Sequence, residues 1–284
     1  MDLAYRLLNV FTLAGDRLSG NPLCVFQDGR GLETGRMQAL DRQFNLSETT
    51  FVLPPERTEA TARVRIFTPD FEMPFAGHPT LGTAHVVRAL TGAGDRVGLE
   101  MKAGLVEVRA DGDRWTLRTA RAPATRPPEA SPDQLAAMVG LPAGSVSHPL
   151  WVNCGVEQLV LPVRSVDEVR AARPDPERLS RHGRSPDGGE TMAYVFAEAG
   201  PGQVEARFFF MAGGGVQEDP ATGSACANLG GYLLATGAPL PARRVVAQGA
   251  QVGRPSRLLL DVDGAGSVFV TGQVVELGRG TIRV

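Results

Sequence analysis

Apolar residues follow two spacings along this chain, one typical of buried strands and one typical of amphipathic helices. Short apolar runs bounded by Gly, Pro or Ser predict strands in the first half at 7–12, 23–26, 50–53, 62–67, 99–101, 106–109 and 115–118. A three-to-four-residue spacing predicts helices there at 33–44 and 80–90. The second half predicts helices at 132–139, 166–172, 176–181 and 223–235, among strands at 149–153, 158–162, 193–197, 204–210, 245–248, 257–262 and 267–272.

One motif, Glu-x-Pro-x-x-Gly, occurs twice and is followed each time by an apolar helix. It begins at Glu72 and again at Glu218, and a strand that contains Arg-x-Phe precedes each copy. Both copies run strand, glycine-proline loop, helix and then a meander of strands. A chance match between two β–α units of a glycine-rich chain is the alternative, but the matching order of the surrounding elements favours an internal repeat.

The length of 284 residues predicts about two domains. The proline-rich segment 122–132 is the best linker, so we expect an N-terminal domain at 1–125 and a C-terminal domain at 126–284. The extreme C-terminal strand is a candidate to return to the first domain. With 43% hydrophobic and 21% charged residues the chain has the composition of a globular protein and not of a disordered one.

Composition excludes several kinds of chemistry and partner. The net charge of −2 gives no basic excess for nucleic acid. Lys102 is the only lysine, in a poor position for Schiff-base chemistry, and none of the three cysteines lies in a C-x-x-C pair. No stretch is apolar and long enough for a membrane span or a signal peptide. We expect a cytoplasmic protein with no metal and no membrane or nucleic-acid partner.

The two motifs place Gly77 and Gly223 where the apolar helices begin. The first turn of a helix has unpaired N–H groups and a partial positive charge, so it can bind an anion without a lysine. Two repeated domains would also enclose a cleft, a common place for ligands. A pair of such helix ends predicts a site for a small carboxylate, although each end taken singly is also typical of a capping loop.

Three ionisable residues lie close to these loops. His78 follows Gly77, where the helix dipole disfavours its charge, and Asp219 precedes the second proline. Each suits either substrate binding or local capping. Glu48 lies between a helix and an apolar strand, where a helix-end role competes with general acid/base catalysis. A general acid/base at neutral pH needs a shifted pKa, which burial would give to a carboxyl group.

Together these segments resemble the PhzF (phenazine-biosynthesis) family, within the diaminopimelate epimerase-like superfamily. The matching stretches occur in family order at 20–26, 46–51, 72–82 and 213–225. The resemblance implies an α/β (α+β) fold of two pseudo-symmetric domains. Each would be a curved, mostly antiparallel sheet wrapped around a central helix, formed here by 80–90 and 223–235. Homodimers are usual in the family.

The resemblance also implies a cofactor-free isomerase with its site between the domains. Glu48 would be the general acid/base that moves a proton between carbons of a small carboxylate, and His78 and Asp219 would be its catalytic partners. The substrate-binding residues would be Gly77, Gly223 and Ser224. In the phenazine enzyme of the family the substrate is trans-2,3-dihydro-3-hydroxyanthranilate.

The chain departs from the wider superfamily at the two helix starts. Racemases and epimerases of this fold use a cysteine at each, but this sequence has Ala76 and Thr222 there. Neither side chain can act as a thiolate base, which disfavours two-cysteine racemisation. Cys226 lies one turn further and is expected to face the core. The alternatives to an isomerase are a racemase or epimerase of an amino or hydroxy acid, and a non-catalytic protein that binds a small acid.

Overall fold

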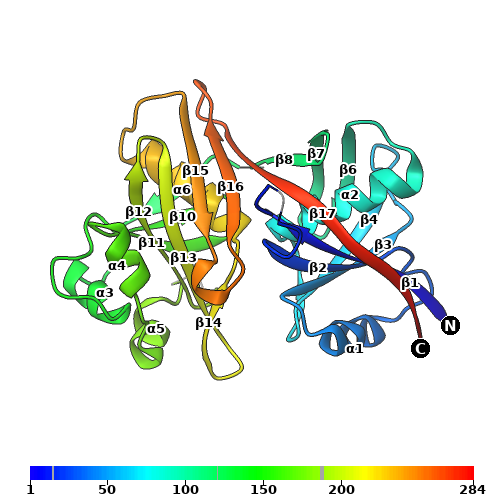
Figure 1. The fold of residues 1–284 in the computed structure, drawn as a ribbon, viewed down its shortest axis with the longest axis horizontal. Coiled ribbons are helices and arrows are strands. Elements are labelled where there is room, and N and C mark those ends of the chain that lie inside the picture. Colours follow the sequence, from blue (N-terminus) through cyan, green and yellow to red (C-terminus); the bar gives the residue numbers. More distant parts are fainter. Residues whose placement is uncertain (15, 120, 186–188) are drawn as a thin grey trace. The chain divides into compact units, whose positions relative to one another are not determined.

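The computed structural model describes residues 1–14, 16–119, 121–185 and 189–284 (Figure 1). The chain forms two compact units. The first comprises Met1–Arg118 together with Thr271–Val284, and the second comprises Thr119–Val270. The C-terminal strand therefore belongs to the first unit. The first break precedes the expected one between 125 and 126, because strand β9 (Ala124–Arg126) already pairs within the second unit.

The first unit is a mostly antiparallel sheet with two helices. Its elements are β1 (Asp2–Val10), β2 (Asn21–Phe26), α1 (Thr34–Phe44), β3 (Glu48–Leu53), β4 (Ala62–Phe67), β5 (Glu72–Met73), α2 (Gly77–Thr91), β6 (Arg96–Met101), β7 (Gly104–Asp111) and β8 (Arg114–Arg118). Parallel pairing joins β2 to β3 and β4 to β6. The pairs β1–β2, β3–β4, β4–β5, β6–β7 and β7–β8 are antiparallel.

The second unit has the same kinds of pairing. After β9 its elements are α3 (Pro132–Met138), β10 (Leu150–Asn153), β11 (Glu157–Pro162), α4 (Val166–Ala171), α5 (Pro176–His182), β12 (Met192–Gly200), β13 (Gln203–Ala212), β14 (Gly215–Asp219), α6 (Gly223–Ala235), β15 (Ala242–Gln248) and β16 (Ser256–Val262). Parallel pairing joins β11 to β12 and β13 to β15. The pairs β10–β11, β12–β13, β13–β14 and β15–β16 are antiparallel.

This order of pairings makes the two units topological repeats. In each, a parallel pair (β2–β3 or β11–β12) leads into an antiparallel pair (β3–β4 or β12–β13) and then into a short hairpin strand, β5 or β14. A central helix follows, and the next strand returns parallel to the strand before the hairpin. The structure thus confirms a mixed α/β fold.

Each central helix is buried over most of its length. Ten residues of α2 and ten of α6 are buried. Glycines let strands approach these helices closely: a Cβ at Gly82 of α2 would lie 2.5 Å from a methyl group of Leu23 on β2. A Cβ at Gly230 of α6 would likewise lie 2.7 Å from Val268. An apolar helix packed against a sheet on several sides explains why its sequence has little amphipathic contrast.

Several elements differ from the sequence-based prediction. Strand β1 begins at Asp2 rather than at residue 7, and the segment taken as a linker contains β9. Strand β17 (Val268–Arg283) continues well past residue 272, where the prediction ended it. The glycine at its predicted end permits close packing: a Cβ at Gly272 would lie 2.2 Å from the ring of Phe11.

The termini of the chain lie side by side in the first unit (Figure 1). The Met1 amino group donates to the Val284 main-chain oxygen at 2.6 Å, at the end of the antiparallel β1–β17 ladder. None of the helices in the described ranges is long and apolar enough to cross a membrane.

Candidate active site

Glu48 and His78 face each other within the first unit. Glu48 begins β3, and His78 is the second residue of α2. The parallel β2–β3 pairing places Glu48 opposite Leu23, next to Pro22 in β2. The Glu48 Oε2 atom lies 3.2 Å from His78 Nε2, and the exposed fractions of the side chains are 15% and 5%. The contact thus joins a carboxyl group with limited access to solvent and an imidazole ring that has almost none.

The His78 ring is neutral at physiological pH. Burial lowers the pKa of His78 from 6.5 to about 3, although a hydrogen bond to Pro22 acts in the opposite direction. Proline has no main-chain N–H, so the ring must donate to the Pro22 carbonyl oxygen. Because Nε2 faces Glu48, the donor is Nδ1. The Nε2 atom of this tautomer keeps a lone pair, which can accept a hydrogen bond from the protonated form of Glu48.

The first turn of α2 supplies further donors. Its N-cap is Ala76, which has no side-chain group to cap the helix. The first intrahelical bond runs from Thr80 N–H to Ala76 oxygen, and Pro79 has no N–H. The main-chain N–H groups of Gly77 and His78 are therefore helix-end donors of α2, with the positive end of the helix dipole behind them.

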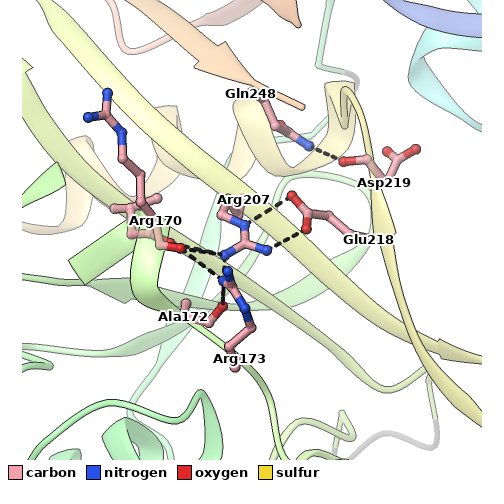
Figure 2. Close-up of polar contacts among 8 residues, drawn as sticks. Arg170, Ala172, Arg173, Arg207, Glu218, Asp219 and Gln248 are labelled. Atoms are coloured by element: carbon pink, nitrogen blue, oxygen red, sulfur yellow. Dashed lines mark hydrogen bonds and ion pairs between the residues drawn. The ribbon is translucent and has the colours of Figure 1, made fainter. Parts of the chain in front are cut away.

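The start of α6 in the second unit is organised around Asp219. Its N-cap residue Thr222 donates its hydroxyl to Asp219 Oδ2 at 2.5 Å rather than capping the helix. Buried Gln248, on β15, donates to Thr222 Oγ1 at 3.0 Å and to the Asp219 main-chain oxygen at 2.8 Å (Figure 2). These bonds hold the Asp219 carboxyl group as an acceptor at the start of the helix.

Ser224 is the second residue of α6, at the position that His78 has in α2. Its Oγ accepts a hydrogen bond from Gln158 Nε2 at 2.9 Å. Gln158, on β11, is 1% exposed, whereas Ser224 is only partly buried. A buried amide therefore holds a hydroxyl group that solvent can still reach.

A bidentate ion pair anchors the loop in front of each central helix. Arg65 binds Glu72 with two contacts of 2.8 Å in the first unit. In the second, Arg207 binds Glu218 with contacts of 3.0 and 2.6 Å, and also donates to the Ala172 oxygen after α4 at 2.7 Å (Figure 2). Glu218 precedes Asp219, so this anchor lies directly beside the candidate site residue.

The cysteines are not placed for thiolate chemistry. Cys24, Cys154 and Cys226 are all free and buried, and burial raises the pKa of each thiol. Cys226 is fully buried, which confirms that it faces the core. Within the described ranges, no three His, Cys, Asp or Glu side chains gather in a way that could hold a metal ion.

Comparison with known proteins identifies the family of this chain. The model of the phenazine biosynthesis-like protein family matches residues 8–280. An uncharacterised isomerase of Pasteurella multocida is 36% identical over 283 residues, covering 99% of this chain and 94% of that one. The trans-2,3-dihydro-3-hydroxyanthranilate isomerase of Pseudomonas aeruginosa is 36% identical over 284 residues, covering 97% and 98%. The chain belongs to the phenazine biosynthesis-like protein family.

Solved structures share the fold of this chain. A PhzF-family phenazine biosynthesis protein of Bacillus anthracis superposes with a TM-score of 0.85 at 22% identity, with complete coverage of both chains. A hydroxyproline epimerase of Agrobacterium vitis shares the fold with a TM-score of 0.66 at 15% identity, covering 99% and 91%. The resemblance to the PhzF family is confirmed. The curated relatives named above are isomerases, which confirms the prediction of an isomerase of this family.

Sequence reasoning named Glu48, His78, Gly77, Asp219, Gly223 and Ser224, and missed the residues that hold them. The structure brings Glu48 to His78 in the first unit and groups Asp219 with the first turn of α6 in the second. That all six meet at one substrate stays a prediction. The missed residues include Gln158 and Gln248. Their signal was an isolated amide in an otherwise apolar strand pattern, because a buried amide needs hydrogen-bond partners.

Proposed function

We propose that this protein is a cofactor-independent isomerase that moves a proton within a small carboxylate substrate, with Glu48 as the general acid/base. The contact between Glu48 Oε2 and the Nε2 atom of neutral, buried His78, at 3.2 Å, carries the proposal. One proton suffices to bridge these two acceptors, so the pair can hold a proton taken from a substrate carbon and give it back.

The proposed reaction has two proton transfers and one carboxyl group. The Glu48 carboxylate removes a proton from one carbon, and the electron pair of that C–H bond shifts into the conjugated system of the substrate. Protonated Glu48 then donates a hydrogen bond to His78 Nε2 while the substrate anion persists. Glu48 finally returns the proton to a different carbon. Such general acid–base help typically contributes about 10²–10⁴-fold to the rate.

Substrate binding is assigned to the helix ends. We propose that the N–H groups of Gly77 and His78, with Gly223 and Ser224 of the second unit, hold the anionic and acceptor oxygens of the substrate. Asp219, kept as an acceptor by Thr222, would bind an amine or hydroxyl group of the same molecule. The first probe is trans-2,3-dihydro-3-hydroxyanthranilate, which carries a carboxylate, an amine and a hydroxyl group and is named for the Pseudomonas aeruginosa relative.

Two other functions would differ from this one in the groups they require or in the absence of turnover. A racemase or epimerase needs a second base, and Ala76 and Thr222 offer no thiol for it. His78 or Asp219 would then have to serve. A non-catalytic protein would bind carboxylates without turning any over. The expected homodimer stays a prediction that bears on none of these alternatives.

The test is proton exchange in heavy water. The protein and its Glu48→Gln variant are incubated with a panel of small cyclic carboxylates that includes trans-2,3-dihydro-3-hydroxyanthranilate, and NMR follows deuterium incorporation and isomer formation. We expect isomerisation in the parent and its near-complete loss in Glu48→Gln, which keeps the shape and removes the titrating group. Exchange that survives in the variant would move the chemistry to His78 or Asp219. Binding of panel compounds without exchange would favour the non-catalytic function.

A further inference from the structure

A chain of buried amides behind Ser224 fixes the direction of its hydrogen bonds. Asn228, in α6, is 0% exposed, and Gln158, on β11, is 1% exposed. Asn228 Nδ2 donates to Gln158 Oε1 at 2.8 Å, and Gln158 Nε2 donates to Ser224 Oγ at 2.9 Å. The chain thus leads from the middle of the helix to its first turn.

Main-chain groups decide which way both amides face. The Cys154 N–H, which can only donate, lies 2.8 Å from the Asn228 oxygen, and the Val156 carbonyl, which can only accept, lies 2.9 Å from the Asn228 nitrogen. The Asn228 nitrogen therefore also faces the Gln158 oxygen. It follows that the Gln158 nitrogen faces Ser224, and that Ser224 Oγ is an acceptor in that bond.

The hydroxyl proton of Ser224 is consequently left for a ligand. Among the residues that the structure describes, none accepts it, and Gln158 occupies a lone pair of Oγ. Ser224 is also the least buried residue in the first turn of α6. It presents an O–H donor beside the N–H donors of that turn, an arrangement that suits an acceptor oxygen such as that of a carboxylate.

The fold itself does not require this polar pair. In the parallel β2–β3 ladder of the first unit, Leu23 lies opposite Glu48. In the parallel β11–β12 ladder of the second unit, Gln158 lies one residue before the Leu159–Ala193 pair and so has the place of Leu23. Helix positions counted from Gly77 and Gly223 match Gly82 with Asn228. The first unit therefore packs Leu23 on Gly82 where the second bonds Gln158 to Asn228. Buried amides in place of a working apolar contact indicate a function.

We propose that Gln158, anchored by Asn228, is a positioning residue that fixes Ser224 as a hydrogen-bond donor to an oxygen of the carboxylate substrate. This inference rests on the proposed function, because it assigns Ser224 to the same substrate as Glu48. Gln158 acts through Ser224, so removing it matters only while the Ser224 hydroxyl is present.

A double-mutant cycle tests the proposal with Ser224→Ala, Gln158→Met and their combination. The readouts are KM and kcat for trans-2,3-dihydro-3-hydroxyanthranilate, and calorimetric binding of anthranilate, a planar analogue that lacks the carbon–hydrogen bond to be broken. We expect Ser224→Ala to raise KM about tenfold and Gln158→Met to raise it about threefold to tenfold, with kcat changed less than twofold. In the Ser224→Ala background, Gln158→Met should add nothing.

Met192→Leu is the matched control, because the Met192 sulfur lies 3.8 Å from Gln158 Nε2, the same atom that donates to Ser224. It should leave KM unchanged. Circular dichroism checks folding. If Gln158→Met does not fold, the pair Gln158→Leu with Asn228→Gly copies the apolar contact of the first unit and replaces it in the cycle.

The outcomes separate this inference from the proposed function. Fully multiplicative effects of the two substitutions, or an equal effect of Met192→Leu, would overturn the role of Gln158 even where Glu48→Gln abolishes turnover. A parent that binds anthranilate and shows the coupling in binding, but turns nothing over, would support the positioning role and contradict the isomerase. A parent that does not bind anthranilate would overturn the positioning role as stated.

Discussion

The two units repeat one scaffold and differ at the residues to which the proposed function assigns the chemistry. In each, an Arg–Glu ion pair anchors the loop before a central helix whose N-cap provides no side-chain cap. Thr49 pairs with Phe67 in one and Ala193 with Phe209 in the other, so the residues just before them, Glu48 and Met192, are equivalent. The first unit thus has a carboxyl group at the position where the second unit has a thioether.

The second helix position differs as well. His78 meets Glu48 and is held by a main-chain oxygen, whereas Ser224 is held by a buried amide. The helix end is thus common to both units, whereas the proposed function assigns proton transfer to the first unit alone. The second unit keeps hydrogen-bonding groups that do not titrate near neutral pH, namely Ser224 and Thr222, around one carboxyl group.

The largest expected effect is on kcat/KM, and it distinguishes Glu48 from Met192, the equivalent residue of the second unit. Glu48→Gln should lower kcat/KM by about 10²–10⁴-fold, because it removes the only group assigned to proton transfer. Met192→Leu, a change of similar volume at the equivalent place, should leave it within about twofold. Steady-state kinetics on the two variants measures both. Similar losses in the two would mean that the units share the chemistry.

The ion pairs should differ in what their loss does to stability. Arg207 is 5% exposed and also binds main-chain oxygens, whereas Arg65 is 21% exposed. We expect Arg207→Met to lower the free energy of unfolding by about 3–5 kcal/mol, because it leaves Glu218 buried without its partner. Arg65→Met should cost about 1–2 kcal/mol. Urea unfolding of both variants decides this, and equal losses would contradict the difference in burial.

Acid sensitivity should belong to the first unit. The pKa of His78 is about 3 in the folded protein and near 6.5 when unfolded, so the unfolded state binds the extra proton. The contribution of neutral His78 is complete above pH 6.5 and is lost as pH falls towards 3, to a total on the order of 4 kcal/mol.

Unfolding free energies measured from pH 7 to pH 3.5 should therefore fall less steeply in His78→Gln than in the parent. Ser224→Ala, at the equivalent position, should follow the parent curve. Parallel curves for all three proteins would show that His78 titrates normally in the folded state.

Substitution of Asp41 should have the smallest effect on stability, and its pH dependence should be opposite to that of His78. It lies in α1 and is 0% exposed. Burial raises its pKa to about 7, although hydrogen bonds from Thr49 act the other way. Its contribution is favourable below pH 4 and is lost as pH rises through 7. Asp41→Asn should thus raise the free energy of unfolding by roughly 1–3 kcal/mol at pH 8 and leave it unchanged near pH 4. An equal change at both pH values would contradict the raised pKa.

The sequence predicted the central helices well, because their apolar runs are long. Helix α6 spans the predicted range, and α2 begins three residues earlier than predicted, at Gly77. Pro79 was taken to precede the helix, but a proline is tolerated in the first turn, where its missing N–H is not needed. The strand predicted at 267–272 continues to Arg283 as β17, and Gly272 within it permits packing against Phe11.

The site could be predicted only as a set of separate residues. Spacing and resemblance pointed to Glu48 and His78, but their contact depends on the parallel β2–β3 register, which pattern alone does not give. The supporting amides were missed because Gln158 and Gln248 lie in strands where side chains alternate between faces. Which face is buried, and which partner an amide finds there, is decided by tertiary packing.

In the proposed mechanism one carboxyl group both removes and returns the proton. A single-turnover reaction in ordinary water, with the substrate deuterated at the carbon that loses its proton, tests it most directly. Mass spectrometry and NMR then read the label in the product. Part of the deuterium should reappear at the accepting carbon, because Glu48 returns the nucleus it took. Complete absence of label there, at early and late times alike, would show a second proton donor and contradict the single-carboxylate mechanism.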